Sequence, residues 1–277
     1  MPFKNLSWKM RWALLASVTL VLSFGLLLSR TGEVKAEKNP KPEDVVERTI
    51  LAYGSRAALY AVQRNGTLRA LVKFISPDGT REGKTVTKFI RKEKLKDDLR
   101  IIELDFPGTR DMLGFDGKDI WSILDGEVQK TTEDVMKAFR LGHEHSYESL
   151  LRYKENNSKL EYVSNTKLLN LEIDVIDLIS PEGVRTRYEI SRKSGRILYL
   201  NYEEKTDEKA EPVKYRLNFK DFRIIQNTLI PYETLVFQDG KLVEERKIVE
   251  AVFNVQLKEE AFKAENANKP AEAAAKQ

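Results

Sequence analysis

Residues 171–202 read LEIDVIDLISPEGVRTRYEISRKSGRILYLNY, and this stretch decides the fold class. Apolar and acidic residues alternate from Leu171 to Val175, which is the two-residue period of a β-strand with one buried face. The turn sequences PEG at 181–183 and SG at 194–195 separate this run from two further strands. Strands joined by such short turns pair antiparallel, so the segment predicts a meander of hairpins.

Strand patterns also occur on both sides of this segment, separated by Asp-Gly and Pro-Asp-Gly turns. About a dozen antiparallel strands make a sheet that curls strongly. The sequence therefore predicts a mainly β (α+β) protein with one strongly curved antiparallel sheet. The other predicted strands cover residues 68–74, 85–91, 100–106, 120–124, 215–220, 229–237 and 242–252.

Helical spacing interrupts the strand patterns in two places. Over residues 42–64, apolar residues recur every three or four positions after a proline suited to a helix start. A second interval, residues 132–153, opens near a capping-box sequence and carries the apolar residues Val135, Met136 and Phe139. We expect an N-terminal helix and one or two short central helices that cover the sheet, with these three residues on a lid.

The N-terminus predicts export. Residues 12–29 carry no charge, follow Lys4, Lys9 and Arg11, and precede a cleavage signal that ends at Ala36. The run is just long enough to span a bilayer, so a retained inner-membrane anchor is the alternative. Both interpretations place the rest of the chain in the periplasm. The expected organisation is a signal peptide over 1–36, a binding domain over 37–263 and a disordered tail over 264–277.

Charge and cysteine content narrow the choice of partners. The chain has 47 basic and 43 acidic residues; removing residues 1–36 takes away five and one of these and leaves 42 of each. A balanced surface provides no field for a phosphate backbone, so we expect no nucleic-acid partner. The absence of cysteine excludes disulfides, thiol catalysis and cysteine-based zinc sites.

Histidine content argues against most catalytic and metal sites. His143 and His145 are the two histidines of the chain, and such a pair lacks the further ligands of a zinc site. No nucleophile elbow, phosphate-binding loop or dinucleotide-binding glycine motif is present. Paired acids such as Asp97 and Asp98 lie in charge-dense stretches typical of solvated turns. We expect no catalytic residues, no metal and no cofactor, and a hydrolase is the less favoured alternative.

Aromatic and apolar side chains within the predicted strands are the candidate binding residues. They fill a packed core or they line a cavity on the concave side of the sheet, and the sequence leaves both interpretations open. The candidate lining residues are Phe74, Phe89, Trp121, Ile173, Tyr188, Tyr199, Tyr215 and Phe219.

The order of these features resembles the LolA/LolB-type lipoprotein carrier superfamily. The resemblance rests on a leader, a first helix, a meander with the hairpin FDGKDIW at 115–121, short helices, and further hairpins with YRLNF at 215–219 and IP at 230–231. It extends over residues 42–262. It implies a half-closed antiparallel barrel covered by helices, with an apolar cavity that receives acyl chains of lipoproteins or lipids.

Two functions follow from this resemblance. The first is a monomeric periplasmic binder or carrier of lipoproteins or lipids, with an inner- or outer-membrane protein as a further partner. The second is an envelope-stress regulatory or interaction module of the same fold that binds a membrane protein. The resemblance also implies an arginine that contacts the lid, for which Arg69, Arg91 and Arg100 are all candidates.

Overall fold

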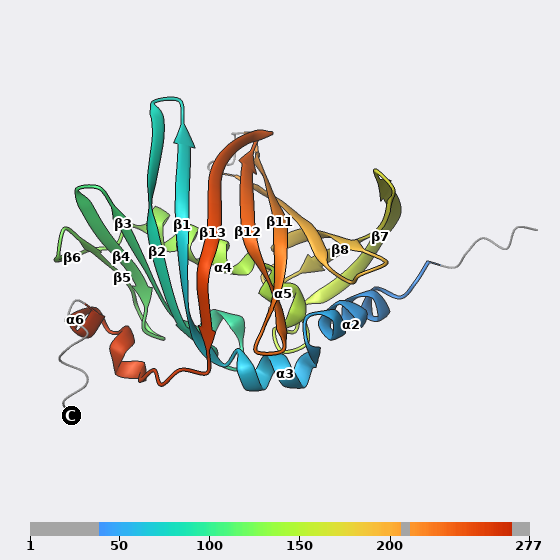
Figure 1. The fold of residues 1–277 in the computed structure, drawn as a ribbon, viewed down its shortest axis with the longest axis horizontal. Helices are drawn as coiled ribbons and strands as arrows, with labels where there is room; N and C mark the ends of the chain where they lie inside the picture. The colour runs from blue at the N-terminus through green and yellow to red at the C-terminus, as the bar shows by residue number, and fades with distance from the viewer. Residues whose placement is uncertain (1–38, 206–210, 268–277) are drawn as a thin grey trace, which may run out of the picture. The chain divides into compact units, whose positions relative to one another are not determined.

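A single antiparallel sheet organises the part of the chain that begins at Pro40 (Figure 1). The computed structural model describes residues 39–205 and 211–267, so the predicted signal peptide and most of the predicted tail lie outside the described residues. Among the described residues, no helix combines the length and apolar character needed to cross a membrane.

Thirteen strands form this sheet, in the order β6-β5-β4-β3-β2-β1-β13-β12-β11-β10-β9-β8-β7. Two meanders, β1–β6 and β7–β13, are joined where β1 pairs with β13, and the sheet remains open between β6 and β7. The strands are β1 (Asn65–Ser76), β2 (Gly79–Ile90), β3 (Leu99–Phe106), β4 (Thr109–Phe115), β5 (Ile120–Leu124), β6 (Glu127–Gln129), β7 (Lys159–Leu168), β8 (Leu171–Ile179), β9 (Arg185–Ser191), β10 (Ile197–Glu204), β11 (Val213–Ile225), β12 (Thr228–Gln238) and β13 (Lys241–Phe253).

The helices agree in part with the sequence prediction. Two central helices are confirmed, but the predicted N-terminal helix is divided in two at Gly54. The φ of Gly54 is 121°, and a Cβ there would lie 2.6 Å from the carbonyl oxygen of Asn227, so the chain turns at this glycine. The helical segments are α2 (Pro42–Ala52), α3 (Ser55–Val62), η1 (Leu95–Asp97), α4 (Glu133–Glu144), α5 (Tyr147–Leu151), η2 (Glu259–Phe262) and α6 (Ala264–Ala267), the last within the predicted tail.

Strand register gives the sheet two distinct faces. Phe89, Arg100, Phe115 and Ile120 are paired in sequence across β2–β5, so their side chains share one face. Arg100 on this face contacts His143 of α4. Because residues of β3–β5 and of β8–β9 line one cavity on this side, the sheet curves around it, and we call this the concave face. The predicted mainly β fold with a strongly curved, half-open barrel is confirmed.

Helices fill the concave face of the second meander. Val46 and Ile50 of α2 and Leu150 of α5 pack in one core cluster with buried side chains of β8–β12. The hydroxyl of Tyr188 donates a 2.8 Å hydrogen bond to the carbonyl oxygen of Ser146 and so fixes the start of α5. This half of the sheet is therefore closed by the protein's own side chains.

The C-terminal segment covers the opposite, convex face of the first meander. Ile101, Met112 and Trp121 form a cluster there with Phe262 of η2. The indole Nε1 of Trp121 donates a 2.8 Å hydrogen bond to the carbonyl oxygen of Phe262. The chain that follows β13 thus returns to pack against β3–β5.

Strand β8 differs from the one-sided pattern predicted for it. Asp174 was expected to face water, yet its exposed fraction is 0%, and that of Asp177 on the same strand is 1%. Arg48 and Arg192 bind Asp174 at 2.7 and 2.9 Å, and Arg187 binds Asp177 at 2.7 Å. Paired guanidinium groups compensate the desolvation of these carboxylates, so alternation of apolar and acidic residues did not indicate exposure here.

Candidate functional site

The concave face of the first meander is only partly covered. Several of its apolar side chains are half-buried, although Ala70, Val72 and Phe106 on the same face are buried. The concave residues Tyr188 and Leu200 of the second meander, in contrast, are fully buried beneath helices. A ligand could therefore cover apolar surface that the protein leaves in contact with water. The half-buried residues are Phe74, Phe89, Ile102, Leu104, Leu113, Phe115 and Ile120.

Helix α4 lies against this surface without packing tightly. None of its residues is buried, and Val135 on its apolar side is 40% exposed. Most helical stability in proteins comes from burying an apolar face, and α4 gains little from this source. Its start is instead fixed by Thr132, whose side chain accepts a hydrogen bond from the amide of Val135.

A cavity of about 560 Å³ separates α4 from the sheet, within the range of about 300 to 1,000 Å³ typical of small-ligand sites. Phe115 and Ile120 of the first meander form one wall, and Leu178 and Val184 of the second form another. Phe139 of α4 reaches the cavity, as its predicted lid role requires. We call this space the α4 cavity.

A polar contact ties α4 to the wall of the cavity. Arg100 Nη1 lies 3.1 Å from His143 Nδ1, and His143 Nε2 lies 3.1 Å from the carbonyl oxygen of Leu95. Since a guanidinium group only donates, Nδ1 must accept the hydrogen bond and Nε2 carries the proton. Asp98, next to this imidazole, is held by Arg152 at 2.5 Å. Although burial alone would raise it, the pKa of Asp98 is lowered by His143 and Arg152.

The three candidate lid arginines have different partners. Arg100 contacts α4, whereas Arg91 binds Glu148 of α5 at 2.6 Å. Arg69 forms an exposed pair with Glu250. Burial would raise the pKa of Glu148, but the charge of Arg91 and its other cationic neighbours lowers it, so this carboxylate stays ionised.

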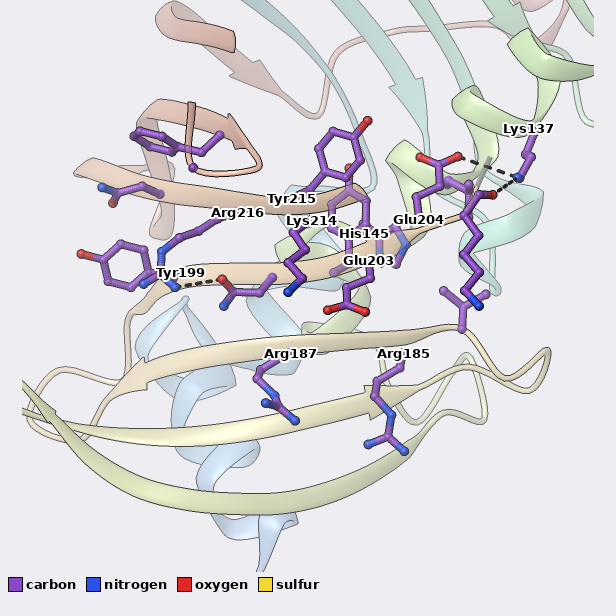
Figure 2. A pocket seen from close by; sticks show the side chains of 18 of the residues that line it. Lys137, His145, Arg185, Arg187, Tyr199, Glu203, Glu204, Lys214, Tyr215 and Arg216 are labelled. Carbon is purple, nitrogen blue, oxygen red and sulfur yellow. Dashed lines mark hydrogen bonds and ion pairs between the residues drawn. The ribbon is translucent and has the colours of Figure 1, made fainter. Parts of the chain in front are cut away.

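A second, more open cavity of about 1,000 Å³ lies where β9 and β10 separate (Figure 2). The two strands pair up to Arg187 and Asn201; beyond this point β10 remains paired with β11 and β9 with β8. Arg185 and Arg187 come from one side and Tyr199 and Tyr215 from the other. We call this space the β9–β10 cavity.

An aromatic stack lines the β9–β10 cavity close to the α4 cavity, and Val184 lines both. The ring of His145 lies 3.8 Å from that of Tyr202, which lies 4.8 Å from Tyr215. His145 lines the β9–β10 cavity and Thr186 lines the α4 cavity, and their side chains are hydrogen bonded at 2.8 Å. Burial lowers the pKa of His145 to about 4, so the imidazole is neutral at neutral pH.

Most positive charges around the β9–β10 cavity are compensated. Arg187 binds Asp177, which is buried, and Arg216 binds Glu189 at 2.8 Å. Lys137 of α4 lies 3.9 Å from Glu204. This cavity therefore presents a mixed surface that includes the aromatic rings of Tyr199 and Tyr215.

The predicted lining residues are divided among four environments. Phe74 and Phe89 lie on the half-covered concave face, and Tyr199 and Tyr215 line the β9–β10 cavity. Ile173, Tyr188 and Phe219 are buried, the last two in the helix-covered core. Trp121 lies on the convex face beneath Phe262, because its register partner is Gly114 rather than Phe115. Sequence reasoning did not select Ile102, Leu104 and Ile120, which lie in predicted strands, or Leu113 and Phe115, which lie in the unpredicted strand β4.

Comparison with known proteins gives a fold relationship. Neither a protein-family model nor a curated protein sequence matches the chain. A domain described as an outer membrane lipoprotein-sorting protein from Vibrio parahaemolyticus superposes with a TM-score of 0.55 at 13% identity, covering 83% of this chain and 100% of that one. A DUF1329 family protein from Desulfovibrio piger gives 0.56 at 14% identity, covering 82% and 99%. A LolA superfamily protein from Nitrosomonas europaea gives 0.53 at 9% identity, also covering 82% and 99%. The resemblance predicted from sequence is thus confirmed as a shared fold.

Proposed function

We propose that this protein is an exported binder or carrier of lipids or lipoproteins, and that it holds an acyl chain between α4 and the concave face of β1–β5. One observation carries the proposal. An apolar concave face is left half-covered beneath a helix none of whose residues is buried. The expected leader over residues 1–36 supports export, and two of the similar folds belong to proteins named for lipoprotein sorting or for the LolA superfamily.

The energetics of such a site favour reversible binding. At about 0.8 kcal/mol for each buried methylene, a chain of about 16 carbons gains roughly 12 kcal/mol. Association and ordering cost on the order of 4 to 15 kcal/mol. The difference permits binding that a downstream acceptor can reverse, as a carrier requires.

The test is uptake of a fluorescent fatty acid by purified, detergent-free protein, together with native mass spectrometry of retained lipid. Ile120→Gln places an amide in the wall of the α4 cavity, and we expect it to weaken binding about tenfold. Leu71→Gln is the matched control, because Leu71 is 48% exposed and lies on the convex face of β1. Its affinity should equal that of the wild-type protein.

Two results would count against the proposal. Absence of bound lipid together with absence of fatty-acid uptake would exclude an acyl-binding cavity. Equal effects of the Ile120 and Leu71 substitutions would place any binding outside the α4 cavity. Capture of one stoichiometric membrane protein, unaffected by lipid, would instead favour the interaction module of the same fold.

A further inference from the structure

We infer that the acyl ligand carries an anionic headgroup, a carboxylate or a phosphate, and that Arg100 in the wall of the α4 cavity binds it. This inference rests on the proposed function and adds the chemical class of the ligand. It also assigns Arg100 a role in binding besides its contact with α4.

Arg100 is a cation placed within an apolar wall. It lies on β3 between Phe89 and Phe115, its register partners on either side, and lines the same cavity as Ile120. A guanidinium group in such surroundings loses much of its hydration, and burial lowers the pKa of Arg100. Arg100 is partly buried, and the charges of Glu148 and Asp98 raise its pKa against the effect of burial, but neither carboxylate forms an ion pair with it within 4 Å. An anion that contacts the guanidinium group directly would therefore be stabilised here.

The partner of Arg100 is unlike those of the neighbouring arginines. Arg91 and Arg152 each bind a carboxylate, at 2.6 and 2.5 Å. Arg100 contacts a neutral acceptor, the Nδ1 atom of His143, and among the described residues it forms no ion pair within 4 Å. A guanidinium group has five N–H donors in a planar fork that suits a carboxylate or a phosphate. Donors therefore remain for a ligand in the cavity.

The wider charge of the cavity favours the same ligand. Five cationic side chains line it against three acids. One of these acids, Asp98, is already bound by Arg152 and by the amide of Lys92 at 2.8 Å. The remaining acids are Glu144 and Glu182, so cations are in excess among the residues that line the α4 cavity. The cationic residues are Lys94, Lys96, Arg100, Lys118 and Arg140.

The experiment compares ligands that share a chain and differ in head charge. Palmitate is compared with hexadecanol, and palmitoyl lysophosphatidate with monopalmitoylglycerol, by calorimetric titration at pH 8. We expect the wild-type protein to bind at least one anionic member about 10- to 100-fold more tightly than its neutral counterpart, because bonds to charged groups are strong. Tighter binding of palmitate than of hexadecanol indicates a carboxylate headgroup. Tighter binding of palmitoyl lysophosphatidate than of monopalmitoylglycerol indicates a phosphate headgroup.

The variants identify the residue responsible. Arg100→Gln should abolish the preference for the anionic member while leaving hexadecanol affinity within about threefold, which also shows that the variant is folded. Arg110→Gln is the matched control, since Arg110 pairs with Glu103 in an exposed position and should retain the preference. Equal affinity of wild-type protein for both members of each pair, or equal weakening of both by Arg100→Gln, would overturn the inference. Failure of all four ligands to bind would overturn the proposed function itself.

Discussion

His145 occupies a position in which protonation is costly. Its side chain is 5% exposed, its Nδ1 atom is hydrogen bonded to Thr186, and its ring stacks on Tyr202. Burial would remove the charged imidazolium form from water, and this lowers the pKa of His145 to about 4. An unfolded chain would titrate this group near 6.5.

Acid should therefore destabilise the fold through this residue. Between pH 6.5 and 4 the unfolded state binds more protons than the native state, so stability is fully present above this window and is lost as the pH falls. The contribution of His145 amounts to about 2 kcal/mol lost by pH 5. We expect urea unfolding of His145→Gln to change less between pH 7.5 and pH 5 than that of the wild-type protein. Identical pH profiles for the two proteins would contradict this assignment.

Individual side chains show where sequence reasoning about the site was limited. Periodicity identifies which residues of a strand share a face, as it does for Leu68, Ala70, Val72 and Phe74 of β1. It does not show which face is left open, because Trp121 is as apolar as Phe115 but is covered by Phe262, 141 residues further along the chain. Arg100 is one of the three candidate lid contacts. Its place in the cavity wall depends on the pairing of four strands, β2 to β5, which no local pattern shows.

At the scale of elements, we expect the short C-terminal segment to contribute strongly to the stability of the first meander. Phe262 is 1% exposed in a cluster with Leu99, Ile101 and Trp121. Replacing it with alanine leaves a cavity, and we expect Phe262→Ala to lower the free energy of unfolding by about 3 to 5 kcal/mol. Because the other two tryptophans fall at positions 8 and 12, protein lacking residues 1–36 reports on Trp121 alone. Its emission should shift to the red.

A control tests whether the effect is specific to this cluster. Phe237→Ala removes the same side chain from a half-exposed position of β12, remote in the sheet order from β5. Phe237→Ala should lower the free energy of unfolding much less than Phe262→Ala does, and it should leave the emission of Trp121 unchanged. An unaltered spectrum in Phe262→Ala would show that η2 does not cover the indole in solution.

Turns were predicted correctly where the residue types of the turn itself determine the backbone conformation. The Asp125-Gly126 turn has both residues at positive φ, 51° and 84°, as the predicted tight hairpin requires. Strands β4, β6 and β7 were not predicted. In β7, Lys, Glu, Ser and Asn interrupt the apolar residues, and the pairing of this edge strand is supplied by β8.

At the scale of the molecule, the covering of the sheet is unequal. The β1–β13 pairing joins a meander whose concave face is filled by α2, α3 and α5 to one whose concave face is half-covered. Strands β2–β5 of the same meander bury convex side chains beneath the C-terminal segment. No local pattern contains this distribution, since it depends on where helices and the C-terminal segment return to the sheet. Because its concave face is only half-covered, the first meander is where we expect ligand binding to change the structure.

Hydrogen exchange measures directly how firmly α4 is held against the first meander. Helix α4 buries none of its residues, whereas Ser149, Leu150 and Leu151 of α5 are buried, so amides of α4 should exchange faster than those of α5 in the free protein. A bound acyl chain would cover Phe139, which lines the α4 cavity, and should slow exchange in α4 by shifting the population towards the packed state. Amides of β12 and β13 should not change. Equally slow exchange in α4 and α5 before ligand is added would mean that α4 is held as firmly as the core helices and could not serve as a lid.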